Sequence, residues 1–396
     1  MGGIAPKPHT APRLARRSCN RTDPHAGHAY DAVVDDTPEF VDWVLAERVA
    51  RRVAQRTAPT IDPRSRQRLV DDFAELTPLA ESLVEESTGL RSVGAARAEV
   101  TDRGDWVRAN IGSFRRLLRP LFERANAEGG FGRNLPPPMA KAARLAAGTE
   151  LGVVLGWMST RVLGQYDLFR AEQVDGSSDS VYYVGPNVIA LERRHGFPSH
   201  EFRLWIAVHE LTHRAQFTGV SWMREYFLGL VDKGLTITSP EPRQIMAAVT
   251  RMAADIRARR NPLDAGLLGA FASPEQLVTI HEIQALMSLL EGHGDVTMNR
   301  AAADRIPGAE RFAKTLQARR ESARGLTRLI QQLIGLEAKM RQYQEGEEFV
   351  EAVERTGGPE LFAKVWEDPS HLPTLEEVRD PARWISRLGG RTLELA

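Results

Sequence analysis

The chain of 396 residues, with 42% hydrophobic and 26% charged residues, has the composition of a soluble globular protein of one large domain or two ordinary ones. Its 52 basic and 52 acidic residues cancel, so no overall field attracts nucleic acid or an anionic membrane, and the most apolar run, 151–158, is far shorter than the ~20 residues of a membrane-spanning helix. The single cysteine, Cys19, excludes an intrachain disulfide, and we expect a cytoplasmic protein that binds neither nucleic acid nor membranes.

The N-terminal part of the chain is predicted to be helical after a flexible leader. Residues 1–37 contain Pro, Gly, His and Arg without periodicity, which is typical of a disordered segment. A first helix is expected to begin at Pro38, and a second helix covers 65–88 and ends at Gly89. The apolar positions of 93–126 recur at helical spacing and predict a third helix.

A Gly- and Pro-rich segment, 129–138, is the clearest internal boundary in the chain. It predicts an N-terminal helical lobe over 38–135 and a catalytic region over 139–396, and we expect the two to form one compact unit. The next helix is predicted at 139–163, and three of its glycines, at four-residue spacing, would let another backbone approach closely. These are Gly148, Gly152 and Gly156.

Two short β-prone runs, 181–184 and 188–191, are separated by a Gly-Pro-Asn turn and predict a small sheet. The second run either offers an edge to which an extended peptide substrate pairs, or merely closes the sheet. After Pro198 most of the chain is again predicted to be helical, so the fold class is mostly α with a small β element (α+β). The predicted helices cover 199–218, 221–230, 240–260, 274–297, 308–319, 321–341, 345–355 and 359–366.

The sequence H-E-x-x-H, formed by His209, Glu210 and His213, lies in one of these predicted helices. A helix places positions i and i+4 on one face, so both imidazoles can bind one ion, Zn²⁺. Glu210 then lies beside the ion, where its carboxylate can take a proton from a water that zinc activates. The metzincin continuation requires Gly at 216 and His at 219, and it is excluded because Gln216 and Gly219 stand there.

A catalytic zinc ion needs a third protein ligand from elsewhere in the chain. The leading candidate is Glu291, at the end of an apolar helical run, with Asp295 four residues later on the same face. This pair resembles the arrangement in thermolysin-like enzymes (gluzincins), in which the Glu binds zinc and the Asp orients the first histidine. His293 and His281 are the alternatives, and His293 requires the helix to be interrupted at the glycines beside it.

A group that stabilises the transition state is also expected, and its candidates are Tyr226, His293 and Tyr183. Arg214, directly after the second histidine, departs from the longer zinc-protease consensus, which prefers an uncharged residue at that position. This departure counts against proteolysis more than against zinc binding.

Several blocks of sequence spread over about 38–390 carry a wider resemblance. They are Val41–Trp43 with Arg51 and Arg52, Trp106–Asn110 with Ser113 and Phe114, Leu155–Ser159 running to Gln165–Asp167, Val184–Asn187, His209–Phe217, and Leu290–His293 with Asp295. Together they resemble an actinobacterial family of zincin-like hydrolases, some of whose members are labelled as associated with the biosynthesis of a deazaflavin coenzyme. The resemblance implies a mostly helical zincin-type fold with two histidines and a carboxylate as zinc ligands, and it brings no substrate.

We therefore predict a zinc-dependent hydrolase, in the first place a metallopeptidase, in which Glu210 activates a water for attack on an amide carbonyl. A small-molecule amide hydrolase is the enzymatic alternative, with a small amide as substrate in place of a peptide. The other alternative is a binding protein that keeps the zincin fold without activity, although such a protein has no need of Glu210.

Overall fold

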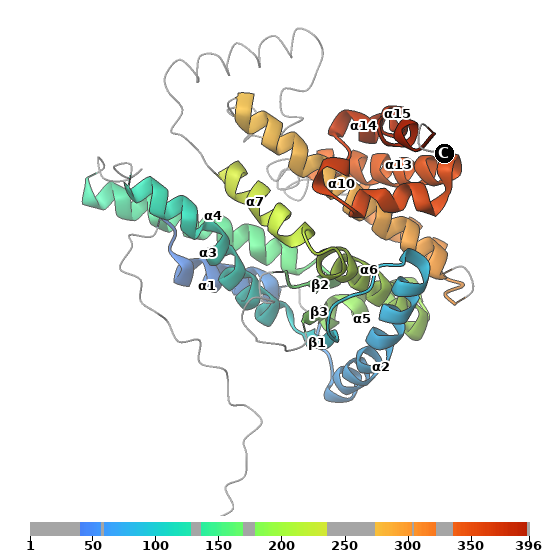
Figure 1. The fold of residues 1–396 in the computed structure, drawn as a ribbon. Helices are drawn as coiled ribbons and strands as arrows, with labels where there is room; N and C mark the ends of the chain where they lie inside the picture. Colours follow the sequence, from blue (N-terminus) through green and yellow to red (C-terminus); the bar gives the residue numbers. More distant parts are fainter. Residues whose placement is uncertain are drawn as a thin grey trace, which may run out of the picture. The chain divides into compact units, whose positions relative to one another are not determined.

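The structure, a computed structural model, describes residues 40–56, 59–127, 136–168, 179–235, 274–302, 305–321 and 336–393 (Figure 1). These residues belong to one compact unit, Pro38–Ala396, and form a mostly helical fold with one small three-stranded sheet, which confirms the predicted fold class. None of the helices in these ranges combines the length and apolar character needed to cross a membrane. The predicted leader, most of the predicted boundary at 129–138 and the predicted helix 240–260 lie outside the described residues, so the division into two lobes stays a prediction.

The start of the first helix and the end of the second have clear capping residues. Helix α1 begins at Trp43, later than predicted, because residues 40–42 are not helical and the Asp42 carboxylate accepts a hydrogen bond from the backbone N–H three residues later (2.8 Å); Pro38 lies outside the described residues. Helix α2 (Pro63–Thr88) ends, as predicted, at Gly89, whose φ of 71° lies in the left-handed region that favours glycine.

Helices α1 (Trp43–Arg56) and α4 (Pro137–Ser159) pack against each other along the regularly spaced glycines of α4. A Cβ on Gly152 would lie 2.6 Å from the carbonyl oxygen of Ala46, a distance that no side chain tolerates. The other glycines that make the same approach to α1 are Gly148 and Gly156. The predicted close approach of another backbone is therefore confirmed.

The sheet has the strand order β1-β3-β2. Its central strand, β3 (Ser180–Val184), is buried along its whole length and confirms the strand predicted at 181–184. β1 (Arg97–Thr101) pairs with it in parallel, and β2 (Gly164–Tyr166) pairs with it antiparallel. Among the described residues, β1 and β2 are thus the edges of the sheet.

Two predictions of secondary structure near the sheet are wrong. The helix predicted over 93–126 is replaced in its first part by β1, and helix α3 spans Arg103–Ala127. The Ala- and Glu-containing segment before Asp102 has helical propensity, but its pairing with β3 overrides that weak preference. The strand predicted at 188–191 belongs instead to helix α5 (Gly185–His195), because a short apolar run does not distinguish a buried helix from a strand.

The main core lies between α2, the sheet and helix α6 (Ser199–Gly219), which is buried on most of its surface. Helix α10 (Pro274–Ala302) contacts α6, and helix α13 (Leu336–Ala363) packs along α10 (Figure 1). The remaining elements are α7 (Met223–Leu235), α11 (Ala309–Glu321), η1 (Lys364–Trp366), η2 (Pro369–His371), α14 (Leu375–Arg379) and α15 (Pro381–Leu393). The backbone of α13 is not helical at Gly357 and Gly358, so the helices predicted at 345–355 and 359–366 are separated there, and the second continues into η1.

The contact between α1 and α4 predicts a clear difference between two glycine substitutions. We expect Gly152→Ala to lower the free energy of unfolding by about 1–3 kcal/mol, because the new methyl group must push two backbones apart. Gly112→Ala in α3 is the matched control: a Cβ there meets no atom within 4 Å, so it should stabilise by about 0.5–1 kcal/mol. Urea unfolding of both variants measures this, and equal effects would contradict it.

Candidate metal centre

Helix α6 carries His209 and His213 one turn apart on the same face. Their Nε2 atoms lie 3.2 Å apart, and the two rings are nearly perpendicular, with an interplanar angle of 81°. Both side chains are partly buried, with 23% and 17% of their surfaces exposed. The pair therefore directs two nitrogens toward one point that solvent still reaches.

Helix α10 contributes the carboxylate of Glu291 to the same point. Its Oε2 lies 3.8 Å from Nε2 of His213 and 3.9 Å from Nε2 of His209. Over the described ranges, these three residues are the group of possible ligands close enough together to hold a metal ion. Tetrahedral zinc with bonds of about 2.0–2.2 Å separates its ligand atoms by about 3.3–3.6 Å, so the observed triangle fits zinc with small adjustments.

Helix α10 runs without interruption through the glycines on both sides of His293. Gly292 allows a close approach to α13, since a Cβ on it would overlap the backbone of Gly346. Gly294 faces the histidine pair, and a Cβ on it would lie 3.7 Å from atoms of both imidazoles. These glycines therefore serve close packing around the centre and do not break the helix.

His293, the alternative ligand, is engaged elsewhere. It is buried, and its Nδ1 lies 2.9 Å from Nε2 of Gln216. Burial, together with the positive charges of Arg300 and His213, lowers the pKa of His293 to about 3, so its imidazole is neutral. His281, the other alternative, is exposed on α10 and does not belong to the cluster.

Glu210 is 7% exposed and lies directly under strand β2. Its Oε2 accepts a hydrogen bond from the backbone N–H of Tyr166 (3.2 Å), and a Cβ on Gly164 would lie 2.6 Å from its Cγ. Burial raises the pKa of Glu210 to about 7; the Glu291 charge adds to this, while His213 and the N–H of Tyr166 act against it. The carboxyl group can therefore gain or lose a proton near neutral pH.

Asp295 lies one turn after Glu291 on α10 and is partly buried. Burial lowers the pKa of His213, but the charges of Glu291, Glu210 and Asp295, with the hydrogen bond to Gln216, raise it overall. Asp295 is therefore near enough to act electrostatically on His213.

Arg214 is fully buried, and its guanidinium bonds to groups outside the metal cluster. It forms an ion pair with Glu81 of α2 and donates to the carbonyl oxygens of Val93 (2.7 Å) and Gly94 (3.0 Å). The charged residue after the second histidine thus joins α6 to α2 and to the segment before β1, and its departure from the protease consensus has a structural cause.

Two of the three candidate transition-state donors hydrogen-bond to other side chains. The Tyr183 hydroxyl bonds to the hydroxyl of Thr77 (3.0 Å), and His293 bonds to Gln216. Tyr226 of α7 packs against Trp222, which directly precedes that helix. The residues that sequence reasoning missed are Gly164 and Tyr166 of β2 and Gln216; only Gln216, three residues after His213 on the same helix face, had a detectable signal.

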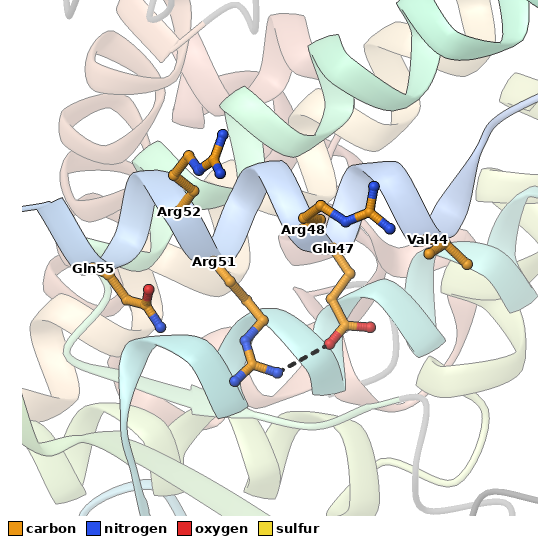
Figure 2. A pocket seen from close by; sticks show the side chains of 6 residues that line it. All are labelled: Val44, Glu47, Arg48, Arg51, Arg52 and Gln55. Atoms are coloured by element: carbon orange, nitrogen blue, oxygen red, sulfur yellow. Dashed lines mark hydrogen bonds and ion pairs between the residues drawn. The ribbon is translucent and has the colours of Figure 1, made fainter.

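A surface hollow of about 470 Å³ lies along α1, far in sequence from the residues of the metal cluster. All the residues that line it belong to α1. Figure 2 shows the ion pair of Glu47 with Arg51, and it draws no such contact for Arg48 or Arg52 with the other labelled residues. No member of the metal cluster lines it. It has the character of a solvated helix face.

Comparison with known proteins shows the family to which the chain is similar. The family described as zincin-like metallopeptidases matches residues 41–385. A crystal structure from Chloroflexus aurantiacus, described as a "putative hydrolase with a novel fold", is 31% identical, covers 88% of this chain and 99% of its own chain, and superposes with a TM-score of 0.65. No curated protein matches the chain.

The environment of Glu210 predicts how the metal-free protein responds to pH. Its pKa of about 7 in the folded protein lies above the ordinary value of 4.5, so the folded state holds the proton more tightly and stability falls as pH rises from 4.5 to 7. We expect Glu210→Gln to remove this loss and to exceed the native chain by up to about 3 kcal/mol above pH 7, with no difference below pH 4.5.

Urea unfolding with a chelator present, repeated across pH, measures this difference. Glu282→Gln on α10 is the control, because Glu282 is exposed. A gain in stability that is the same at every pH would contradict the assignment.

Proposed function

The chain belongs to the family of zincin-like metallopeptidases, and we propose that it is a zinc-dependent peptidase whose ligands are His209, His213 and Glu291. The observation that carries this proposal is the convergence of the three ligand atoms beside the buried carboxyl group of Glu210. Two imidazoles and one carboxylate are a ligand set of catalytic zinc, which keeps a further position for water. Zinc bound there supplies Lewis acidity toward a water molecule and toward the scissile carbonyl.

Glu210 is the proposed proton carrier. Its carboxylate accepts the proton of the attacking water and then delivers it to the amine that leaves. The N–H of Tyr166 holds the carboxylate in place.

Asp295 is proposed to orient His209, the first histidine of the motif. An acceptor at Nδ1 keeps the proton on that nitrogen and leaves Nε2 free to bind a metal. The position of Asp295 one turn beyond Glu291 supports this role.

An extended peptide is the proposed substrate, and β2 is the strand beside which it would lie. Leu163 and Asp167 direct their backbone hydrogen bonds toward β3, so the intervening Gly164 and Tyr166 direct theirs to the side of the strand away from β3. The N–H of Tyr166 already meets Glu210, which brings this edge next to the proposed proton carrier. The edge predicted at 188–191 does not exist, because that segment is helical.

Two alternatives keep the same centre. A small-molecule amide hydrolase would cleave short acylated amides and leave unstructured peptides intact, whereas the peptidase cleaves the peptides. A catalytically inactive binding protein would cleave neither, and the buried carboxyl group of Glu210 counts against it, since burying that group lowers stability without benefit. The cytoplasmic location and the link to a deazaflavin coenzyme stay predictions.

Replacing the proton carrier should abolish turnover and spare the metal. For Glu210→Gln we expect kcat/KM on an unstructured peptide to fall by about 10²–10⁴-fold, because the amide cannot accept a proton. Metal analysis should give the same zinc content as for the native chain, since Gln retains the shape of Glu. Full activity in this variant would overturn the role of Glu210.

Replacing the third proposed ligand should instead weaken the binding of zinc itself. The native chain, purified without chelator, should contain about one zinc per molecule, and Glu291→Ala should weaken zinc binding beyond the roughly 10–100-fold typical of outer partners. Competition with a chromogenic chelator measures the affinity. Glu282→Ala, a change at an exposed position on the same helix, should bind zinc like the native chain; native-like binding by Glu291→Ala would remove Glu291 from the centre.

A further inference from the structure

Gln216 joins the two helices that carry the proposed zinc ligands. It lies on α6 one turn after His213, with its side chain buried. Its Oε1 lies 3.0 Å from Nδ1 of His213. Its Nε2 lies 2.9 Å from the carbonyl oxygen of Leu290 and 2.9 Å from Nδ1 of His293, both on α10.

The carbonyl oxygen of Leu290 determines which way the amide faces. A carbonyl oxygen only accepts hydrogen bonds, so the atom of Gln216 next to it must be the NH₂ group. The amide oxygen therefore faces Nδ1 of His213, which must carry a proton to make the bond. With the proton on Nδ1, the lone pair of His213 is on Nε2, the nitrogen that faces Glu291.

The second N–H of the same NH₂ group meets His293. An amide nitrogen only donates, so Nδ1 of His293 accepts, and this imidazole is neutral with its proton on Nε2. Its ring packs against Phe362 (centroids 5.4 Å apart, stacked) and Trp366 (5.0 Å, edge-on). The backbone oxygen of Trp366 in turn accepts from the indole N–H of Trp222 (3.1 Å).

We propose that Gln216 is a positioning residue that sets the tautomer and orientation of the metal ligand His213, and that His293 is the acceptor that keeps Gln216 in this orientation. The amide oxygen of Gln216 accepts one hydrogen bond and its NH₂ group donates two. Each of the three partners is compatible with only this orientation of the amide. Because Leu290 directly precedes Glu291, the same amide also ties the third proposed ligand to the histidine pair.

This inference rests on the proposed zinc centre, but it makes a separate claim about zinc affinity. In Gln216→Met, which keeps the length of the side chain and removes its polar atoms, Nδ1 of His213 loses its acceptor. We expect zinc binding to weaken by about 10–100-fold, as is typical when the partner of a ligating imidazole is removed. Nitrogen-detected NMR of the imidazoles should report the loss of the single Nδ1–H form of His213.

A matched pair of variants at His293 tests the second half of the proposal. In His293→Asn the side-chain oxygen can take the place of Nδ1 as acceptor, while His293→Leu has no acceptor. Both variants lose the aromatic ring, so they should bind zinc equally well if His293 serves only in packing. We expect His293→Asn to bind zinc within about threefold of the native chain and His293→Leu to bind it about 10-fold more weakly.

The outcomes are distinct. If the native chain binds no zinc, the proposed function fails. If it binds zinc and Gln216→Met binds it equally well with an unchanged His213 tautomer, the positioning role is wrong while the zinc centre stands. If both His293 variants lose zinc as completely as Glu291→Ala, His293 is itself a ligand and the proposal is overturned. If Gln216→Met does not fold, the two His293 variants decide, because equal zinc affinities of His293→Asn and His293→Leu would refute the proposal.

Discussion

The candidate metal centre depends on the contact between helices α6 and α10. α6 carries two imidazoles and α10 carries a carboxylate, and neither helix could hold a metal ion alone. The contact requires a surface without bulky side chains, which Gly294 supplies beside the imidazoles. On its other side α10 is held by α13, where Gly292 and Gly346 bring the backbones together. The glycines around the third candidate ligand are thus part of how the candidate centre is assembled.

The proposed catalytic carboxyl group lies in a place that costs stability. Glu210 is enclosed between α6 and β2, where Gly164 leaves just enough room for it. Burial raises its pKa, and the nearby Glu291 raises it further. An ordinary structural carboxylate would be paired with a cation here, as Glu192 is with Arg203 in the same core. A buried carboxyl group with such a pKa next to possible metal ligands is typical of a functional site.

The secondary structure of two short segments was predicted wrongly because their neighbours in the fold determine it. Residues 97–101 lack a strand pattern, yet pairing with β3 makes them β1. Residues 188–191 have a β-prone composition, yet Pro186 starts a helix that packs their apolar side chains inward. The proposed substrate edge therefore moves from 188–191 to β2, a strand of three residues that no periodicity in the sequence reveals.

The chemistry of the centre could be read from the chain because it is local: a helix fixes His209, Glu210 and His213 relative to one another, and helical spacing also places Glu291 one turn before Asp295. The relation between these two groups, more than 70 residues apart, depends on how α6 and α10 pack, and no sequence period encodes that. The same holds for the contact of β2 with Glu210 and for the hydrogen bond between Gln216 and His293. Long-range contacts of this kind arise from burial and hydrogen bonding across the fold, so they become visible only when the helices are in place.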